Sequence, residues 1–540
     1  MAEKIHIRLI QDSFLVGDVK GNARKIITLS QQARQSGVDL VVFPELALSG
    51  YPPEDLLLRQ GFIRQIDTAI KQIQQSVTGI DVVLGAPRHD GEQLFNSAFW
   101  IRDGEQLAVY DKYTLPNYAV FDEKRYFSGG DQPAVVALKG VTFGLSICED
   151  IWYPEPATQA AKAGAKTMLI LNASPYHRGK YQERLDTLQQ RIQETGMSMF
   201  YLNIVGGQDE LVFDGESMVL DSAGQLISQG PDFESVALDV WIDDKGRLGA
   251  DQPLLPAPLS EETSVYKALV TAVRDYVGNN GFDGVVIGLS GGVDSALTLA
   301  IAVDALGADQ VHAVMMPSRY TAQISLDDAA EEARNLGVDY RIISIEPSFQ
   351  AFLETLHEDL AGTEPDTTEE NIQARCRGVI LMALSNKLRR MLLTTGNKSE
   401  MAVGYSTLYG DMAGGFAPLK DVSKTLVYRL CHYRNSISSV IPLRVIERAP
   451  SAELRPDQVD QDSLPDYAVL DAILELSVEQ DRPRAEVIAA GYDEAIVDRV
   501  IRMVQLNEYK RRQAPPGVRI TRRAFGRDRR YPITSGYRRG

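Results

Sequence analysis

Cysteine is scarce in this chain, whose 540 residues include only Cys148, Cys376 and Cys431. So few cysteines, with no CxxC pair and no Cys/His cluster, exclude a disulfide framework and give no zinc-binding pattern. The chain also lacks any run of about 18 apolar residues, and its start, MAEKIHIRLIQDSF, has no apolar stretch typical of a signal peptide. We therefore expect a cytoplasmic protein that spans no membrane.

Positive charge is in deficit, because 56 Lys and Arg residues face 73 Asp and Glu residues and leave a net charge of −17. The exception is the segment 510–540, which holds eleven Lys and Arg residues and one Asp. An acidic body binds nucleic acid poorly, so we expect no nucleic-acid partner. The basic tail could clamp an anionic small molecule or contact an acidic neighbouring subunit, and a nucleic-acid arm is the weakest alternative.

One proline-rich segment, DQPLLPAPLSEET (251–263), separates two halves of the chain. It ends in a helix-start pattern, so we expect a domain at 1–250, a linker at 251–262 and a second domain at 263–540. In the second half, DGVVIGLS, HAVMMPS and RMLLTTGN alternate with helical stretches, which predicts a doubly wound parallel sheet. In the first half, LVVFPE, VTFGLSIC and TMLILNAS alternate with helices as well, which predicts another layered α/β domain.

The motif GLSGGVDS (288–295) follows a short apolar strand and opens a helix. Backbone N–H groups and a helix N-terminus converge at such a glycine turn and favour a phosphate group. The motif lacks the lysine of the ordinary triphosphate loop and carries Asp294-Ser295 instead. An aspartate beside phosphate needs a cation between them, which favours Mg²⁺ and release of pyrophosphate, with transfer of AMP. A tight glycine turn with no ligand is the alternative.

This loop resembles that of the ATP pyrophosphatase (PP-loop) family. Three further blocks, ENIQARCR (370–377), TTGNKSEMAVGYSTLYGDMAGGFAPLKDVSKTLVYRL (394–430) and ERAPSAELRPDQVDQDSLPDY (447–467), resemble the NAD⁺ synthetase family. The resemblance implies ATP as co-substrate, adenylation of deamido-NAD⁺ and displacement of AMP by ammonia. It implies ATP binding by Gly288, Leu289, Ser290, Gly291, Gly292, Val293, Asp294, Ser295, Thr395 and Lys424. It implies deamido-NAD⁺ binding by Asn371, Glu400, Tyr405, Ser406, Thr407, Leu408, Asp411 and Lys510, with Asp294 and Glu400 sharing Mg²⁺. The family's late Pro-Thr-Ala block has Ser451 here, which keeps the hydroxyl.

Three fragments of the first half carry a chemically active residue that follows, or lies close to, an apolar strand-like segment: Glu45 in VVFPELALSGYP, Lys112 in YDKYTLPNYAVFDEKRYFSGG and Cys148 in GLSICEDIW. A thiol needs a base to become a nucleophile, and no histidine is near Cys148 in sequence, so a Cys–His pair would need a distant partner such as His177. A carboxylate could serve instead, with a lysine stabilising the oxyanion. The alternative is that Cys148 is simply a small buried apolar side chain.

These fragments resemble the nitrilase (carbon–nitrogen hydrolase) superfamily over about residues 4–245, which implies a four-layer α-β-β-α sandwich. Carried over, Glu45 is general base and then general acid, Lys112 stabilises the oxyanion and Cys148 forms a thioester. The resemblance also implies that Tyr118, Ser174 and Lys180 bind glutamine, with Glu149 in a supporting role. An N-terminal-nucleophile glutaminase is excluded because residue 2 is Ala2, and SICED is not the elbow of a triad glutaminase.

The whole chain therefore resembles the glutamine-dependent NAD⁺ synthetases, in which a glutaminase supplies ammonia to a synthetase. The resemblance implies small-molecule substrates, a closed ammonia tunnel and a homo-oligomer in which synthetase domains pair. Two enzymatic alternatives stay open at this point. One is a PP-loop ligase that acts on another substrate, and the other is a synthetase that uses free ammonia beside a silent first domain. A non-catalytic nucleotide-binding module is a third, although it would not need Asp294 and Glu400.

Overall fold

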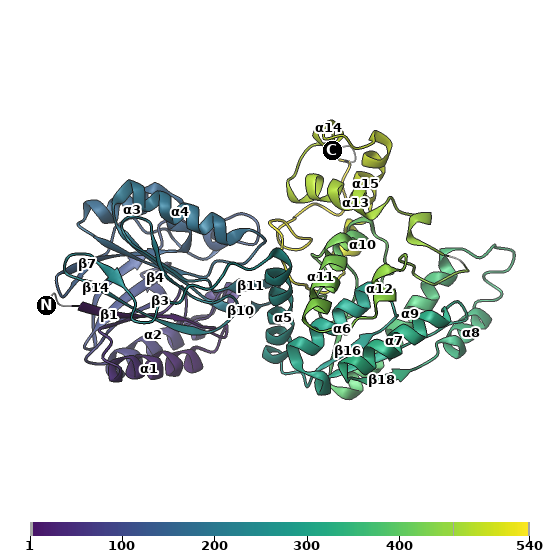
Figure 1. Cartoon of the computed structure of the whole chain (residues 1–540), viewed down its shortest axis with the longest axis horizontal. Coiled ribbons are helices and arrows are strands. Elements are labelled where there is room, and N and C mark those ends of the chain that lie inside the picture. The colour runs from purple at the N-terminus through teal and green to yellow at the C-terminus, as the bar shows by residue number, and fades with distance from the viewer. Residues whose placement is uncertain (1–3, 457, 538–540) are drawn as a thin grey trace. The chain divides into compact units, whose positions relative to one another are not determined.

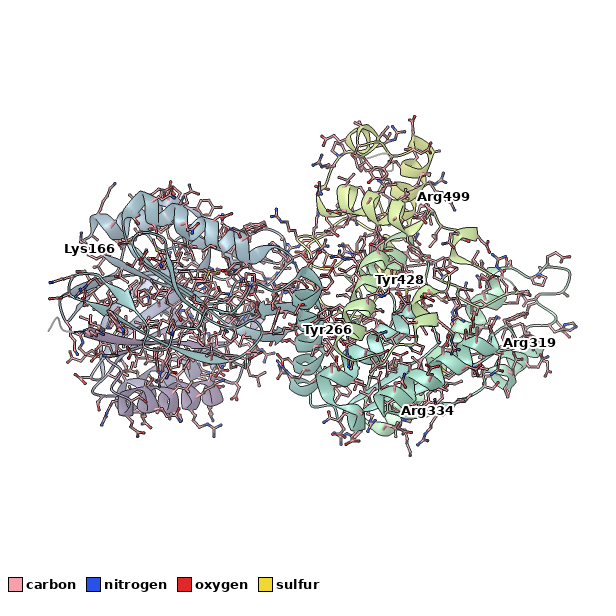
Figure 2. The ribbon with its side chains drawn as sticks, viewed as in Figure 1. Lys166, Tyr266, Arg319, Arg334, Tyr428 and Arg499 are labelled. Carbon is pink, nitrogen blue, oxygen red and sulfur yellow. The ribbon has the colours of Figure 1, made fainter. Side chains whose placement is uncertain are left out.

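The computed structural model describes residues 4–456 and 458–537. Its chain divides into two compact units, one made of residues 1–208 and 212–259 and the other of residues 209–211 and 260–540. Charged side chains such as those of Lys166, Arg334 and Arg499 project outward (Figure 2). We describe each unit by itself.

The first unit has two facing sheets. One has the order β15-β14-β1-β2-β3-β4-β5, with β1 parallel to β2, β2 parallel to β3 and the remaining pairs antiparallel. Its strands are β1 (Lys4–Gln11), β2 (Leu40–Val42), β3 (Asp81–Asp90), β4 (Gln93–Arg102), β5 (Glu105–Asp111), β14 (Val236–Asp243) and β15 (Leu248–Gly249). The other sheet has the order β13-β12-β9-β8-β7-β6. Its strands are β6 (Val135–Leu138), β7 (Val141–Ile147), β8 (Thr167–Asn172), β9 (Ser198–Asn203), β12 (Met218–Leu220) and β13 (Leu226–Gln229), and β10 (Val205–Gln208) and β11 (Leu211–Asp214) form a separate ribbon.

Helices cover the outer face of each sheet, which makes four layers (Figure 1). α1 (Val19–Gln35) and α2 (Gln60–Ser76) lie on one side, and α3 (Pro154–Lys162) and α4 (Lys180–Thr195) on the other. The inner faces of both sheets share one buried cluster, to which Ile5, Leu9, Leu145 and Leu169 belong. The α-β-β-α sandwich predicted from the sequence is confirmed.

The second unit is built on a four-stranded parallel sheet with the order β18-β17-β16-β19. Its strands are β16 (Val285–Gly288), β17 (Val311–Met315), β18 (Asp339–Ile342) and β19 (Met391–Leu393). Its longer helices are α5 (Glu261–Asn279), α6 (Val293–Leu306), α7 (Gln323–Leu336), α8 (Glu346–Thr355), α9 (Thr367–Leu388), α11 (Lys424–Ile437), α13 (Tyr467–Leu474) and α15 (Glu494–Leu506). Its shorter helices are α10 (Lys398–Val403), α12 (Leu443–Glu447), α14 (Arg484–Ala489) and α16 (Glu508–Arg511).

The parallel sheet predicted for this half is confirmed, and its topology places the phosphate-loop motif. Strand order reverses at β16, since β17 and β18 continue on one side and β19 returns on the other. Ligands of open α/β sheets bind at such a switch point, beyond the carboxyl ends of the strands. GLSGGVDS lies there, at the end of β16 and the start of α6. The first ten residues of α6 are buried almost all round, because α6 packs among neighbouring helices as well as on the sheet.

Candidate functional site

Glu45, Lys112 and Cys148 lie close together in the first unit, although the first and the last are 103 positions apart in sequence. Each follows a strand of the sandwich: β2 precedes Glu45, β5 precedes Lys112 and β7 precedes Cys148. Lys112 Nζ lies 2.8 Å from Glu45 Oε1, and both side chains are almost completely buried. Gly85 on β3 makes this possible, because a Cβ there would lie 2.4 Å from Leu46 N and would push the Glu45 segment away.

The electrostatics of this centre favour a neutral thiol and a charged lysine. Burial, and then the Glu45 carboxylate, raise the pKa of Cys148 well above its ordinary value, while Lys112 opposes the rise. Burial alone would lower the pKa of Lys112, but Glu123 and Glu45 outweigh it and raise that pKa well above its ordinary value. Cys148 also has a backbone φ of +47°, a strained conformation that is often found at functional residues. The thiol therefore needs a base within reach to become a nucleophile.

The structure adds Glu123, which the sequence analysis missed. Its Oε1 lies 2.8 Å from Lys112 Nζ and accepts a hydrogen bond from Tyr51 OH at 3.2 Å. Burial raises the pKa of Glu123 to about 7, although Lys112 opposes this rise. In sequence, Glu123 lies in DEKR, which is typical of a solvated turn. The only signal for it was that it shares the 110–130 fragment with Lys112.

Three further candidates of the first half, Tyr118, Glu149 and Lys180, lie near Cys148, and the fourth is Ser174. Tyr118 OH donates a hydrogen bond of 2.9 Å to Glu149 Oε1. Burial, and then Arg184, lower the pKa of Lys180 to about 8, while Cys148 and Glu149 act in the opposite direction. Ser174 is fixed through its main chain, because its N donates to Asn203 Oδ1 and its O accepts from Arg184 Nη2, each at 2.9 Å.

His177, the distant partner that a Cys–His pair would need, lies beside Glu183 and Arg178. Its Nε2 lies 3.6 Å from Glu183 Oε2 and its Nδ1 lies 3.0 Å from Arg178 O. The carboxylate that acts most strongly on the Cys148 thiol is Glu45. The geometry thus favours a carboxylate base.

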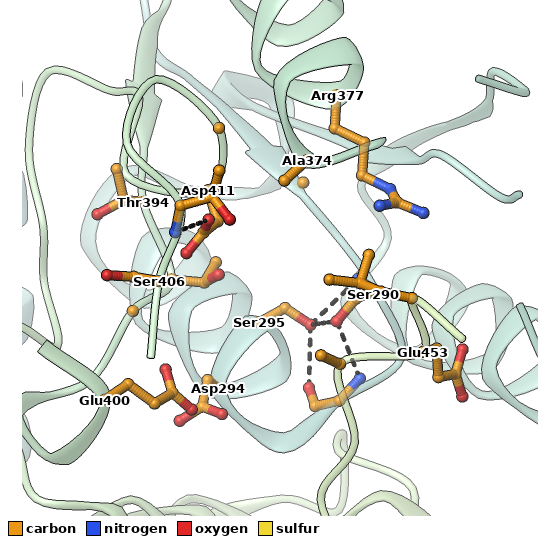
Figure 3. Close-up of a pocket in the computed structure, with 18 of the residues that line it drawn as sticks. Ser290, Asp294, Ser295, Ala374, Arg377, Thr394, Glu400, Ser406, Asp411 and Glu453 are labelled. Carbon is orange, nitrogen blue, oxygen red and sulfur yellow. Dashed lines mark hydrogen bonds between the residues drawn. The ribbon is translucent and has the colours of Figure 1, made fainter. Parts of the chain in front are cut away.

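The GLSGGVDS loop opens onto a cavity of about 520 Å³ (Figure 3). Ser290 N and Gly292 N donate to the hydroxyls of Ser295 and Ser290, each at 3.2 Å, which fixes the loop. Gly291 has φ +79°, and a Cβ there would lie 2.3 Å from Ser325 O, so only glycine fits. Residues 288–290 and 292–295 line the cavity, together with Thr395 and Lys424.

Asp294 and Glu400 both contact Lys424, and all three side chains line this cavity. Lys424 Nζ lies 2.5 Å from Asp294 Oδ2 and 3.2 Å from Glu400 Oε1. Asn397, the N-cap of α10, donates to Asp294 Oδ1 at 2.8 Å. Burial, with Asp294 nearby, raises the pKa of Glu400 to about 8 despite the opposing effect of Lys424. One lysine thus does not neutralise the two carboxyl groups.

Most of the other candidates of the second half line the same cavity. Thr407 Oγ1 donates to Asn371 Oδ1 at 2.8 Å, and Thr407 N donates to Asp411 Oδ1 at 2.7 Å. Lys510 Nζ donates to Gly404 O and Ser406 O at 2.8 and 2.9 Å. Tyr405 and Ser451 line the cavity too, whereas Gly291 and Leu408 are not among its lining residues. Arg377 and Glu453 also line it and were missed (Figure 3).

Family models and relatives match both halves of the chain. The NAD synthase model matches residues 265–514 and the carbon–nitrogen hydrolase model matches residues 7–244. The glutamine-dependent NAD(+) synthetase of Xylella fastidiosa (strain Temecula1 / ATCC 700964) is 52% identical over 544 residues, which cover 100% of both chains. That of Acinetobacter baylyi is 50% identical over 538 residues, which cover 98% of each. The solved structure of the Acinetobacter baumannii glutamine-dependent NAD⁺ synthetase with ADP is 47% identical, has a TM-score of 0.81 and covers 99% of each chain. The chain belongs to the glutamine-dependent NAD⁺ synthetase family.

Several arginines of the basic tail form ion pairs inside the second unit. Arg511 Nη2 and Arg529 Nη1 lie 2.8 and 2.7 Å from Glu508 Oε2, and Arg519 Nε lies 2.7 Å from Asp528 Oδ2. Arg529 also stacks over Tyr531, with 3.8 Å between the guanidinium carbon and the ring centroid. Much of the tail's charge therefore holds the fold together.

The described residues contain neither a membrane-spanning helix nor a cluster of metal-binding side chains. Among residues 4–456 and 458–537, no helix has both the length and the apolar content needed to cross a bilayer. The same residues contain no group of three or more His, Cys, Asp or Glu side chains suited to hold a metal ion. A metal at Asp294 and Glu400 would thus have two carboxylates from the protein.

Proposed function

We propose that this chain makes NAD⁺ from deamido-NAD⁺, ATP and glutamine, with glutamine hydrolysed in the first unit and the amide formed in the second. ATP-dependent amidation of deamido-NAD⁺ is the known reaction of the family to which the chain belongs. The observation that carries the proposal is that one chain holds both a buried carboxylate–lysine–thiol centre and a phosphate-loop cavity. Each centre alone would support only half of the reaction.

Glutamine hydrolysis follows from the contacts of the first centre. Glu45 takes the proton from Cys148 Sγ, and the thiolate attacks the side-chain amide carbon of glutamine. Lys112, charged and fully desolvated, stabilises the tetrahedral oxyanion. Glu45 then gives its proton to the leaving nitrogen, so ammonia departs and a thioester remains for water to hydrolyse.

Tyr118, Glu149, Ser174 and Lys180 are proposed to hold the glutamine backbone. Lys180 offers a cation for the α-carboxylate, and Glu149 offers a carboxylate for the α-ammonium group. Their mutual placement around Cys148 supports this assignment.

In the second unit, the loop residues 288–295 are proposed to bind the phosphates of ATP, with Thr395 and Lys424 beside them. Asn371, Glu400, Tyr405–Leu408, Asp411 and Lys510 are proposed to bind deamido-NAD⁺. Lys424 lines the cavity beside Asp294, where a cation can balance phosphate charge during adenylation.

Mg²⁺ fits the residues present. Mg²⁺ is usually bound through one or two carboxylates together with substrate phosphates and water. Asp294 and Glu400 supply two hard oxygen ligands beside the phosphate loop. When bound there, the ion would neutralise charge on the phosphates.

We also propose domains at residues 1–250 and 263–540 with a linker at 251–262, a homo-oligomer formed through the synthetase domains, and a cytoplasmic location. All three cysteines are free thiols, which supports a reducing compartment.

The testing experiment measures NAD⁺ formation from deamido-NAD⁺ and ATP, with glutamine or with ammonium as nitrogen source. Cys148→Ala should abolish the glutamine-driven reaction and keep the ammonium-driven one. Cys376→Ala, which removes another buried thiol, is the matched control and should leave the ratio of the two rates unchanged. If Cys148→Ala keeps both rates, the glutaminase assignment is wrong; if the wild type makes no NAD⁺ from either source, the substrate is wrong.

A further inference from the structure

We propose that Asn96 is a positioning residue for Glu45, and that it directs the proton of Cys148 to one of the two Glu45 carboxylate oxygens, Oε2. This inference rests on the proposed glutaminase function. Asn96 lies in the middle of β4, opposite Pro87 of β3, and is fully buried. The sequence analysis gave it no role.

Among the described residues, three groups donate hydrogen bonds to the Glu45 carboxylate. Oε1 accepts two hydrogen bonds of 2.8 Å, one from Lys112 Nζ and one from Asn96 Nδ2. Oε2 accepts one hydrogen bond of 2.8 Å, from Ala173 N. The carboxylate is therefore held from β4, β5 and the end of β8 at once.

These three donors leave one acceptor position open. A carboxylate has about four lone-pair positions, two on each oxygen. Lys112 and Asn96 fill both positions on Oε1, while Ala173 fills one of the two on Oε2. Among the described residues, nothing else donates to Glu45, so an incoming proton finds its place on Oε2.

Packing alone does not account for an asparagine at this position. Asn96 Oδ1 is buried and has no hydrogen-bond partner among the described residues. A buried acceptor without a partner costs free energy that an apolar side chain of similar size would not. The amide cannot be turned round either, because its oxygen would then face the Glu45 oxygen and its NH₂ group would lose its acceptor. Among the described residues, the Asn96 side chain donates to Glu45, and this hydrogen bond offsets the free energy lost at Oδ1.

The proton of Cys148 is transferred twice. First, the Cys148 Sγ–H bond breaks, its electron pair stays on sulfur, and a new O–H bond forms at Glu45 Oε2. The thiolate forms the bond to the glutamine amide carbon, whose C=O π pair moves onto the oxygen beside Lys112. When the C–N bond breaks, the same proton passes from Oε2 to the departing nitrogen, and Glu45 is a carboxylate again.

The test compares Asn96→Leu and Asn96→Asp with the same changes at Asn22. Asn22 is a matched control because it is buried in the same unit and donates to two main-chain oxygens, of Leu15 and Leu48, rather than to the Glu45 carboxylate. Glutamate release from glutamine is measured against pH, and ammonium-driven NAD⁺ synthesis is measured in parallel.

For Asn96→Leu, kcat with glutamine should fall roughly 10- to 100-fold, the range for losing a hydrogen bond to a charged group. Its KM for glutamine and its ammonium-driven rate should change little. For Asn96→Asp, the introduced carboxyl group faces the Glu45 carboxyl group, and the two share one proton. At lower pH the introduced carboxyl group is protonated and replaces the amide as donor to Glu45, so activity should be lost on the alkaline side, at a lower pH than in the wild type.

A wild-type kcat for Asn96→Leu, or a wild-type pH profile for Asn96→Asp, overturns the inference. If Asn96→Leu does not fold, the isosteric Asn96→Asp variant decides through its pH profile. Glu45→Gln separates this inference from the proposed function. If Glu45→Gln keeps glutamine-driven synthesis, the glutaminase assignment itself is wrong; if it is inactive and the Asn96 variants are normal, only the role of Asn96 is wrong.

Discussion

Replacing Lys112 by Met should destabilise the first unit, and more so at higher pH. Lys112 Nζ lies 2.8 Å from both Glu45 Oε1 and Glu123 Oε1, and the three side chains are 1%, 0% and 7% exposed. Methionine keeps an unbranched side chain, one heavy atom shorter, but leaves two buried carboxyl groups without their common cation. Removing one partner of a buried ion pair costs about 3–5 kcal/mol.

The pH dependence follows from Glu123. Burial already raises its pKa to about 7 with Lys112 present, and Lys112 is a group that lowers it. Without Lys112, folded Glu123 keeps its proton to higher pH, whereas the unfolded carboxyl releases it near about pH 4.3. The folded state then binds more protons than the unfolded state, so stability falls as pH rises, by about 1.4 kcal/mol per pH unit, until the folded pKa is passed.

The assay is urea unfolding followed by tryptophan fluorescence. All three tryptophans, Trp100, Trp152 and Trp241, belong to the first unit, so the signal reports that unit alone. Lys112→Met should lose about 3–5 kcal/mol above about pH 7, where Glu123 is ionised in the wild type only, and less near about pH 5.5, where Glu123 is protonated in both proteins. Adding Glu123→Gln should restore part of the loss, because one carboxyl group is then gone. An unfolding midpoint equal to that of the wild type at both pH values would contradict this account.

Three further predictions concern other parts of the enzyme. Because burial and Arg184 lower the pKa of Lys180 to about 8, the KM for glutamine should rise as pH passes about 8. Lys180→Arg should move that rise to higher pH. An unchanged KM between about pH 7 and 9 contradicts the glutamine-binding role. Gly291→Ala should raise the KM for ATP roughly tenfold with either nitrogen source and leave glutamine hydrolysis unchanged, because a Cβ there meets Ser325 O at 2.3 Å and φ is +79°. Thr521→Val removes the hydroxyl that donates to Asp421, so thermal unfolding of the second unit should show a loss of about 1–3 kcal/mol, and an unchanged transition would mean that the tail does not stabilise this unit.

The roles of Glu123 and Asn96 could not be predicted from the sequence. Glu45, Lys112 and Cys148 each follow an apolar strand, and that position favours a pocket mouth, so local pattern was enough to select them. Glu123 lies in a charged tetrapeptide, and Asn96 in the middle of a strand, where a polar residue has no distinctive local pattern. Both became visible only through their contacts with Lys112 and Glu45.

The basic tail shows the same limit. The composition of 510–540 was compatible with a ligand clamp, a subunit contact or a nucleic-acid arm. The structure pairs Arg511 and Arg529 with Glu508 and Arg519 with Asp528, and charge counts along a chain cannot anticipate such pairs.

Local features of the chain were enough to establish the family, the α/β class of both halves and the glycine turn at the end of β16. These features are short-range: apolar periodicity, strand-to-helix turns, and motifs of consecutive residues whose backbone geometry is set locally. The folded chain was needed to establish that Lys112 joins Glu45 to Glu123, that Asn96 shares an oxygen with Lys112, and that Lys424 contacts both Asp294 and Glu400. Those pairings join residues 11 to 130 positions apart. A buried charge without a partner of opposite charge costs much free energy, so the stable fold is one in which the two partners are in contact.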